Sequence, residues 1–584
     1  MKYSTIPSAQ IVAHYCKKYG IKDIIISPGS RNAPLTISFT EDAYFNCYSI
    51  VDERAAAFFA LGMAQQQRQP VAVLCTSGSA LLNYYPAVSE AFYSDIPLVV
   101  ISADRPPYKI DIGDGQTIRQ DHVFDRHIRY SANLKLDVTH ATATIKDQAK
   151  EFISEKQSLE EQQAAIVSYN SASLQEAFTQ ALGNSEPIHI NVPFEEPLYN
   201  VTEAKYQLED QSILATKPKE LKDISTYVSL WNKAKRKLVL VGVDYPGQVD
   251  QKYLELLAQD DSVIVLTETT SNIHHPNFFP SIDSLIAPIE KSGHKDQLFS
   301  LLQPDIVLSF GGLIVSKKIK SFLRKYKPKE HWHIDQKKAY NTFFSLTQHF
   351  KTSENTFLGA LLSAPSGIES DYYPYWSRIK HAYEKKRTEY IAQIPFSDML
   401  AFSKVAESIP NNYQLHLANS STVRYAQLFD IHSSISVFCN RGTSGIDGST
   451  STAIGASIYA ETPTLLITGD LSFLYDSNAL WNNYIRPDFR IIVINNEGGG
   501  IFRILPGQED TENFERFFET THHINIADVC KTYHFTHEMV EHSDDLKTSL
   551  ENFYVPSTQP KVLEIKTPRL VNNKILLSYF DFIS

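Results

Sequence analysis

The sequence predicts an α/β protein with three doubly wound parallel-sheet domains. Short apolar runs recur along its 584 residues with helical stretches between them, which is typical of parallel strands covered on both faces. Two stretches, 195–212 and 363–375, lose this apolar periodicity and divide the runs into three groups. A chain of this length also exceeds what one hydrophobic core supports. We therefore expect domains at residues 1–195, 213–362 and 376–584.

The predicted strands are runs of mainly Val, Ile and Leu that end in small or polar residues. Amphipathic stretches between them predict helices, such as those beginning at Ser8 and Ser397, where a serine can cap the first turn. Because both outer domains open with such a helix and then a strand, we expect them to share a plan. The runs lie at 23–27, 71–80, 97–106 and 187–193, then at 237–243, 262–269 and 305–312, and finally at 413–420, 435–442, 463–472, 489–496 and 561–567.

The composition argues against a nucleic-acid partner and against membrane insertion. The formal net charge is −11 at pH 7, whereas a protein that binds a phosphate backbone needs a basic face. No apolar run approaches the roughly 18 residues of a membrane span, and the N-terminus lacks the apolar segment of a signal peptide. The five cysteines form no CxxC pair, so we expect reduced thiols and a cytoplasmic protein.

Two polar motifs follow neighbouring predicted strands. Asp470 follows one run in "TGDLS", and Asn496 ends the next in "INNEGGG". Carboxylate, amide and backbone carbonyl oxygens suit Mg²⁺, which prefers to share the oxygens of a diphosphate. We therefore predict that Asp470, Asn496 and the backbone carbonyl of Gly498 bind a magnesium-diphosphate group. Either motif alone is more often an ordinary turn, so the prediction rests on their pairing.

The paired motifs resemble the cofactor site of thiamine-diphosphate enzymes. The resemblance implies three domains of the thiamine-diphosphate enzyme type: residues 1–195 bind the pyrimidine, residues 213–362 form a central domain, and residues 376–584 bind the diphosphate and Mg²⁺. It also implies a carboxylate beside the aminopyrimidine ring. Glu53, where an apolar run turns into an Ala-rich stretch, is the expected carboxylate. The alternative for Glu53 is an acid favoured by the dipole at a helix N-terminus.

Several further segments resemble one family within that group, the menaquinone-pathway 2-succinyl-5-enolpyruvyl-6-hydroxy-3-cyclohexene-1-carboxylate synthases. The resemblance implies a transferase that decarboxylates 2-oxoglutarate on thiamine diphosphate, with Mg²⁺ or Mn²⁺. The succinic-semialdehyde carbanion equivalent then adds in a 1,4 sense to isochorismate, which gives the compound in the family name and CO₂. The segments are "SPGSRNAPLT", "DERAAAFFALG", "VLCTSGSA", "SADRP", "GQTIRQ", "NRGTSGIDG", "GDLSFLYDSNAL" and "NNEGGGIF".

Both substrates are dicarboxylates, and charged groups in an apolar pocket need partners. Arginine suits this task because its planar fork binds a carboxylate through two hydrogen bonds and stays protonated. For any single arginine a surface salt bridge is the commoner role, and the "KK" of "SKKIK" is typical of a solvated face. The resemblance assigns to the substrates Ser30, Arg31, Arg105, Gln116, Ser420, Arg424, Arg441, Lys317 and Lys318.

The resemblance also assigns residues to the cofactor. Ile446 is expected under its two rings, and Ile501 and Phe502 are expected to wall the pocket, although ordinary core packing uses the same residue types. Glu497 would bring a carboxylate close to the diphosphate unless it points outward. Together with Glu53, Asp470 and Asn496, the cofactor residues are Thr76, Ser77, Ile446, Leu471, Ser472, Ile501 and Phe502.

Two other functions share parts of this pattern. An acetohydroxyacid-synthase-like decarboxylase or carboligase would also have Glu53 and the paired motifs, but it gives no reason for the arginine set. A non-catalytic cofactor-binding protein on the same fold would be expected to lack Glu53 or Asp470. The family resemblance further implies that the cofactor lies between the first domain of one subunit and the third domain of another, so a homodimer or homotetramer is expected.

Overall fold

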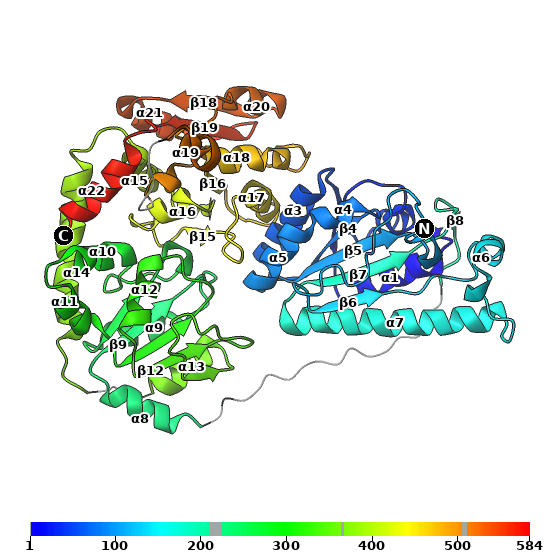
Figure 1. The fold of residues 1–584 in the computed structure, drawn as a ribbon, viewed down its shortest axis with the longest axis horizontal. Helices are drawn as coiled ribbons and strands as arrows, with labels where there is room; N and C mark the ends of the chain where they lie inside the picture. Colours follow the sequence, from blue (N-terminus) through cyan, green and yellow to red (C-terminus); the bar gives the residue numbers. More distant parts are fainter. Residues whose placement is uncertain (1, 207, 209–220, 222, 364–366, 505–510) are drawn as a thin grey trace. The chain divides into compact units, whose positions relative to one another are not determined.

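The computed structural model describes residues 2–206, 208, 221, 223–363, 367–504 and 511–584 (Figure 1). The predicted start of the central domain at residue 213 lies outside them. None of the described helices is both long enough and apolar enough to cross a membrane. The chain forms two compact units. Unit 1 contains residues 1–216, 442–461 and 475–486, and unit 2 contains residues 217–441, 462–474 and 487–584.

Unit 1 is built on a six-stranded parallel sheet with the strand order β3-β2-β4-β5-β7-β6. Alternate strand residues such as Ile24 and Ile26 pack with residues of α1, α2 and α7 in one buried cluster. Helix α3 contacts β2, β4 and β5 and in turn packs against α5. Figure 1 shows α7 along one side of this sheet. The elements are β2 (Asp23–Ile26), β3 (Asn46–Ser49), β4 (Val71–Cys75), β5 (Leu98–Asp104), β6 (Tyr130–Asn133), β7 (Ile188–Pro193), α1 (Pro7–Lys18), α2 (Ala33–Thr40), α3 (Glu53–Gln67), α4 (Ser79–Asn83), α5 (Tyr85–Ser94), α6 (Thr142–Gln148) and α7 (Leu159–Asn184), with α17 (Ser449–Ser457) from the later part of the chain.

Unit 2 contains a five-stranded parallel sheet with the order β10-β9-β11-β12-β13. Its strands are apolar and fully buried in the centre, as in β9 and β11, because helices cover both faces. The elements are β9 (Lys237–Val241), β10 (Val263–Leu266), β11 (Ile306–Phe310), β12 (Glu330–Ile334), β13 (Gln348–Phe350), α8 (Ser225–Lys233), α9 (Gln251–Ala258), α10 (Ile282–Lys291), α11 (Lys295–Leu302), α12 (Lys317–Lys325) and α13 (Glu354–Leu361).

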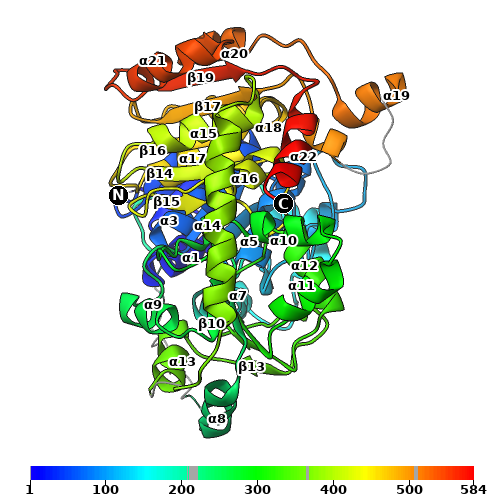
Figure 2. The same cartoon turned by 90° about the vertical axis from the view of Figure 1, so that its left-hand side faces the viewer.

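A second parallel sheet in unit 2 has six strands in the order β15-β14-β16-β17-β19-β18. The long helix α14 (Tyr372–Ile391) contacts β10 and α10 of the five-stranded sheet and also α15 and α22 of this layer (Figure 2). The other elements are β14 (Gln414–Leu417), β15 (Ser436–Phe438), β16 (Thr464–Gly469), β17 (Arg490–Asn495), β18 (Thr536–Val540), β19 (Lys561–Lys566), α15 (Asp398–Ser408), α16 (Ser421–Ala426), α18 (Asp470–Tyr475), α20 (Ile526–Thr532), α21 (Ser543–Phe553) and α22 (Asn572–Phe582).

Every apolar run predicted as a strand contains one, and the predicted α/β fold with three parallel sheets is confirmed. The predicted runs did not include the interior strand β12, the two-stranded sheet of β1 (Tyr3–Ser4) and β8 (Val201–Thr202), or β3, β6, β13 and β18, of which the last four lie at the edges of their sheets. Edge strands are only partly buried, so polar sequences such as NCYS in β3 carry no apolar signal.

The predicted serine caps differ in outcome. Ser397 caps α15, because its side chain accepts a hydrogen bond from the N–H of Leu400. The cap predicted at Ser8 is wrong, since α1 already begins at Pro7 and Ser8 lies in its first turn. The side chain of Asp137, far away in sequence, accepts the N–H of Ser8 at 3.0 Å instead.

Candidate active site

Glu53 is the first residue of α3, and its neighbours hold the start of that helix. Asp52 caps the helix by accepting the N–H of Ala55 at 3.0 Å, and its second oxygen accepts a hydrogen bond of 2.7 Å from Asn478. Arg54 donates to the carbonyl of Tyr475 at 2.7 Å. Among the residues that the structure describes, none hydrogen-bonds the Glu53 carboxylate. The fold therefore fixes the backbone of Glu53 and leaves its carboxylate available.

Two glycines let α3 and α17 pack closely within unit 1. A Cβ on Gly62 would lie 2.0 Å from the carbonyl oxygen of Thr452, and a Cβ on Gly455 would lie 2.0 Å from that of Phe59. No larger residue fits at either position without separating the helices. This packing puts α3, which begins at Glu53, directly against the helix that follows the segment "GIDG".

The segment that leads to Ile446 is anchored by a buried acid. Glu90 of α5 accepts the backbone N–H groups of Gly442 and Thr443 at 2.7 and 2.6 Å. Ile446 itself remains 37% exposed, which is high for an isoleucine that only packs in a core. An apolar ligand ring could cover it.

The predicted residues of the N-terminal sheet come together where its parallel strands end. A Cβ on Gly29 would lie 2.3 Å from the Thr76 side chain, so the "SPGSR" loop contacts the "TSG" loop after β4. Gly78 of the "TSG" loop also approaches the backbone of Gln116, since a Cβ on Gly78 would lie 3.1 Å from the Gln116 carbonyl oxygen. Ser77 has a buried hydroxyl that no described residue hydrogen-bonds.

Glu53 also lies near this group of loops. Burial raises the pKa of the Cys75 thiol at the end of β4, and the Glu53 carboxylate raises it further through its charge. In addition, Arg105, which follows β5, donates to the carbonyl of Gly115 at 3.0 Å and so reaches the loop of Gln116. Apart from Ile446, the sequence-predicted residues of unit 1 thus follow neighbouring strands of one parallel sheet, at whose carboxyl end ligands of α/β sheets bind.

Arg31 is engaged within the protein. It is only 3% exposed, and it donates at 3.0 Å both to the carbonyl of Phe194 and to the carboxylate of Glu196. Its Nε has no partner among the described residues. The two terminal nitrogens of Arg31, which we expected to bind a substrate carboxylate, therefore hydrogen-bond the segment that follows β7.

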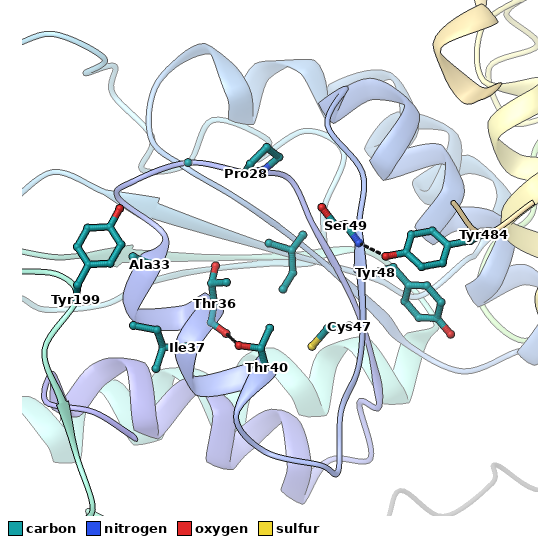
Figure 3. A pocket seen from close by; sticks show the side chains of 12 residues that line it. Pro28, Ala33, Thr36, Ile37, Thr40, Cys47, Tyr48, Ser49, Tyr199 and Tyr484 are labelled. Carbon is teal, nitrogen blue, oxygen red and sulfur yellow. Dashed lines mark hydrogen bonds between the residues drawn. The ribbon is translucent and has the colours of Figure 1, made fainter. Parts of the chain in front are cut away.

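A cavity of about 390 Å³ lies beside the "SPGSR" loop (Figure 3). Tyr484 helps to close it, and its hydroxyl accepts the backbone N–H of Ser49 at 2.8 Å. The cavity shares Pro28 and Gly29 with the "SPGSR" loop, whereas neither Ser30 nor Arg31 is among the described residues that line it. It is therefore distinct from the predicted substrate site. The lining residues are Ile26, Pro28, Gly29, Ala33, Thr36, Ile37, Thr40, Cys47, Tyr48, Ser49, Tyr199 and Tyr484.

In unit 2 the paired motifs meet at the ends of the adjacent parallel strands β16 and β17. Asp470 is buried, and its Oδ2 accepts the N–H of Gly498 at 2.8 Å. The Asn496 side chain donates through Nδ2 to Asp398 at 2.9 Å, which leaves its Oδ1 buried without a donor among the described residues. A carboxylate and an amide oxygen that lacks a donor suit a hard cation, so these residues fit the predicted magnesium-diphosphate group.

Two residues near this group were not predicted from the sequence. Asp398, at the start of α15, orients Asn496 and also accepts the Thr567 hydroxyl at 2.6 Å. His522 donates through Nε2 to Asp470 at 3.1 Å, and this hydrogen bond raises the pKa of His522. In the sequence, the only sign of His522 was that it stands next to another histidine at position 523. No sequence pattern indicated Asp398.

Four further predicted cofactor residues follow the same two strands in the chain. Ser472 lies buried in the first turn of α18, directly after Leu471. Phe502, next to Ile501, is 37% exposed, and its ring centroid lies 6.4 Å from that of Phe518. These positions are compatible with walls of a pocket.

Glu497 pairs with Lys566, with 3.3 Å between the carboxylate oxygen and Nζ. The lysine offsets the negative charge that the sequence placed beside the diphosphate motif.

Three of the four basic residues predicted in unit 2 are engaged by other groups of the protein. Arg441 donates to Asn419 at 2.6 Å, and Arg424 donates to the carbonyl of Ser420. Burial and the nearby Arg441 lower the pKa of Arg424. Lys318 pairs with Glu290, while Lys317 is exposed at the start of α12.

The sequence matches three family profiles in chain order. Residues 7–128 match "Thiamine pyrophosphate enzyme, N-terminal TPP binding domain", residues 207–417 match "Middle domain of thiamine pyrophosphate", and residues 419–565 match "Thiamine pyrophosphate enzyme, C-terminal TPP binding domain". The chain thus contains thiamine-diphosphate-binding domains.

Similar proteins extend over the whole chain. A protein from Christiangramia forsetii is 53% identical over 100% of both chains, and one from Flavobacterium psychrophilum is 51% identical over 99% of both. A protein from Porphyromonas gingivalis is 36% identical over 100% of this chain and 98% of its own. All three are named 2-succinyl-5-enolpyruvyl-6-hydroxy-3-cyclohexene-1-carboxylate synthase. With similarity of this extent and the matching cofactor-binding domains, the chain belongs to the 2-succinyl-5-enolpyruvyl-6-hydroxy-3-cyclohexene-1-carboxylate synthase family of thiamine-diphosphate enzymes.

Proposed function

We propose that the protein decarboxylates 2-oxoglutarate and joins the remaining four-carbon unit to isochorismate in a 1,4-addition. The products are 2-succinyl-5-enolpyruvyl-6-hydroxy-3-cyclohexene-1-carboxylate and CO₂, in menaquinone biosynthesis. One carbon–carbon bond breaks as CO₂ leaves, and one forms at the isochorismate ring. Membership of the synthase family supports this reaction, and the observation in the structure that carries it is the buried Oδ1 of Asn496, which lacks a donor among the described residues and lies at the strand ends beside the Asp470 carboxylate.

The diphosphate end of the cofactor and a divalent ion, Mg²⁺ or Mn²⁺, are assigned to unit 2. Asp470, Asn496 and the backbone carbonyl of Gly498 would hold the ion, and Leu471 and Ser472 would adjoin the diphosphate. Oxygen ligands of this kind suit both ions. When bound, thiamine diphosphate would supply the cationic thiazolium ring that takes up the electron pair left by CO₂.

Glu53 is assigned to the ring nitrogen of the aminopyrimidine, where its carboxylate would share a proton. Support comes from its fixed backbone and from a carboxylate that no described residue hydrogen-bonds. Thr76, Ser77 and Ile446 would contact the rings of the cofactor. The domain roles remain as proposed from the sequence: pyrimidine binding by residues 1–195, a central domain at 213–362, and diphosphate binding by 376–584.

The basic and polar side chains are assigned to the carboxylates of the two substrates. Arg31 would contribute its unpartnered Nε and its positive charge, because its other two nitrogens are engaged by Phe194 and Glu196. Ile501 and Phe502 would exclude water from the reacting carbon. The remaining substrate residues in this proposal are Ser30, Arg105, Gln116, Ser420, Arg424, Arg441, Lys317 and Lys318.

A homodimer is the smallest assembly that the family resemblance implies, and a homotetramer would be built from two such pairs. Light scattering coupled to size-exclusion chromatography, with and without thiamine diphosphate and Mg²⁺, tests this part of the proposal. A monomer that is fully active would contradict it.

The activity is tested by measuring CO₂ release from 2-oxoglutarate with thiamine diphosphate and Mg²⁺, in the presence and absence of isochorismate. Release coupled to consumption of isochorismate and to a joined product of the expected mass would support the synthase reaction. Turnover of pyruvate instead would favour an acetohydroxyacid-synthase-like enzyme. Tight cofactor binding without decarboxylation of either acid would favour a non-catalytic protein.

A further inference from the structure

Glu268 is a buried carboxylate to which none of the proposed roles above has been given. It follows β10 and is 2% exposed. Its Oε2 accepts the backbone N–H of Val315 at 2.8 Å, and its Oε1 accepts that of Ser316 at 2.7 Å. Val315 and Ser316 directly precede Lys317-Lys318, the basic pair at the start of α12. Glu268 therefore holds the backbone that presents this pair.

Two other charged side chains hold the same segment. Lys320 donates through Nζ to the carbonyl of Ile314 at 2.6 Å. The hydroxyl of Ser316, which caps α12, donates to Asp283 of α10. Glu268 and Asp283 thus hold the start of α12 from neighbouring elements, and Lys320 of α12 itself bonds back to the residue before Val315. The exposed Lys317 is the first residue of this helix, so its position follows from that of the backbone.

The charges around Glu268 explain why an acid is needed there. Two lysines at the first positions of a helix face the positive end of its dipole, which disfavours them. The Glu268 carboxylate offsets this positive charge through hydrogen bonds to the N–H groups just before the helix. It also interacts electrostatically with Arg441, while Asp283 interacts with Lys318 and Arg424. The two buried acids lie among the cations proposed to bind dicarboxylates.

The protonation state of Glu268 changes near neutral pH. Its pKa is raised to about 7, chiefly by burial and also by the charge of Asp283, while the two N–H groups and Arg441 act to lower it. Lys320 is the other charged group that faces it, and burial lowers the pKa of Lys320. A protonated carboxyl group has a hydroxyl that cannot accept an N–H in the same way, so protonation weakens the hold on residues 315–316.

We propose that Glu268 is a positioning residue that keeps the Lys317-Lys318 end of α12 in place to bind a substrate carboxylate. The proposal rests on the function proposed above. Ionised Glu268 keeps the segment in place and supports tight binding of a dicarboxylate; neutral Glu268 releases it and weakens that binding. No hydrogen bond joins Glu268 to Asp470 or Asn496 among the residues that the structure describes, so we expect cofactor affinity to stay unchanged when Glu268 is altered.

The test compares the wild type with Glu268→Gln, in which one acceptor oxygen becomes a donor at nearly constant volume. For the variant we expect the KM of at least one dicarboxylate substrate to rise about tenfold or more, because hydrogen bonds to a charged acceptor are lost. We expect kcat and the Kd of thiamine diphosphate to change less than about threefold. In the wild type, kcat/KM should rise with pH through about 7, and this step should be absent from the variant.

Asp260→Asn is the matched control. Asp260 is an acid of the same sheet layer that pairs with Lys237 at 2.8 Å, so its loss perturbs the domain without touching α12. Its substrate KM values should match the wild type. An unchanged KM and an unchanged pH profile in Glu268→Gln would overturn the positioning role, as would equal losses in both variants.

Direct binding of 2-oxoglutarate, measured by calorimetry in the presence of thiamine diphosphate and Mg²⁺, separates this proposal from the proposed function. If the wild type binds 2-oxoglutarate and Glu268→Gln binds it about tenfold more weakly, the positioning role stands even where no joined product forms. If neither protein binds it, the role in dicarboxylate binding is refuted together with the substrate assignment.

Discussion

Replacing Asp398 by asparagine should weaken metal binding although Asp398 is not itself a proposed metal ligand. Its two carboxylate oxygens accept the Asn496 side chain at 2.9 Å and the Thr567 hydroxyl at 2.6 Å. Asparagine has a single side-chain oxygen, so only one of these donors keeps an acceptor. Its new NH₂ group can also donate to the Oδ1 of Asn496, which is the oxygen proposed to bind the ion.

The size of the effect follows from the position of Asp398 behind a metal ligand. Loss of such an orienting partner typically costs about 10–100-fold in metal affinity, or roughly 1.4–2.7 kcal/mol. Burial raises the pKa of Asp398 from 3.8 to about 6, so folding favours its protonated form. The free energy of unfolding therefore falls as the pH rises from about 4 to 6, and it stays lower above that range. Asparagine is uncharged, so the variant does not lose stability in this way. The variant should accordingly unfold at no lower temperature than the wild type at pH 8.

The assay is a calorimetric titration of the protein with Mn²⁺ or Mg²⁺ at a fixed concentration of thiamine diphosphate. It measures the metal affinity directly, so it does not depend on turnover. Asp137→Asn is a matched control, because Asp137 is also buried, has a raised pKa and accepts hydrogen bonds from Ser8 and Gln163. A metal affinity in Asp398→Asn equal to that of the wild type would refute the orienting role. An equal loss in the control would assign the effect to general destabilisation.

Four further substitutions test the other parts of the site. Glu53→Gln should keep thiamine-diphosphate binding within about threefold but lose at least about 100-fold in kcat, because the carboxylate is proposed to share a proton with the cofactor; a near-normal kcat would rule this out. Asp470→Ala should weaken metal-dependent cofactor binding by at least about tenfold in calorimetry, and an unchanged Kd would remove it from the metal site. Arg31→Ala should raise the KM of a dicarboxylate while also lowering the thermal midpoint, since it loses its bonds to Phe194 and Glu196; a lower midpoint with an unchanged KM would leave only a structural role. Gly62→Ala should destabilise unit 1 by about 1–3 kcal/mol in denaturant unfolding, because its Cβ would lie 2.0 Å from a backbone oxygen, whereas Gly183→Ala meets nothing within 4 Å and should not; equal midpoints for the two would contradict the close helix contact.

The central strands and the cofactor-binding class could be predicted from the sequence. Buried parallel strands such as β9 and β17 must be apolar along their length, so their signal is local. The pairing of Asp470 with Asn496 was also readable, because parallel strands place their carboxyl ends at the same edge of a sheet. Edge strands such as β3 were not predicted, since a partly buried strand does not need an apolar sequence.

The partners of the predicted residues depended on tertiary structure. Asp398 meets Asn496 and Glu268 meets Ser316 across long separations in the sequence, and such contacts leave no local pattern. The same holds for Arg31, whose sequence context suggested a substrate ligand but whose terminal nitrogens hold Phe194 and Glu196. The sequence by itself determined which chemical groups stand at the strand ends. Only the folded chain decided which of them are engaged by other residues and which remain open to a ligand, because hydrogen-bond partners are set by proximity in space.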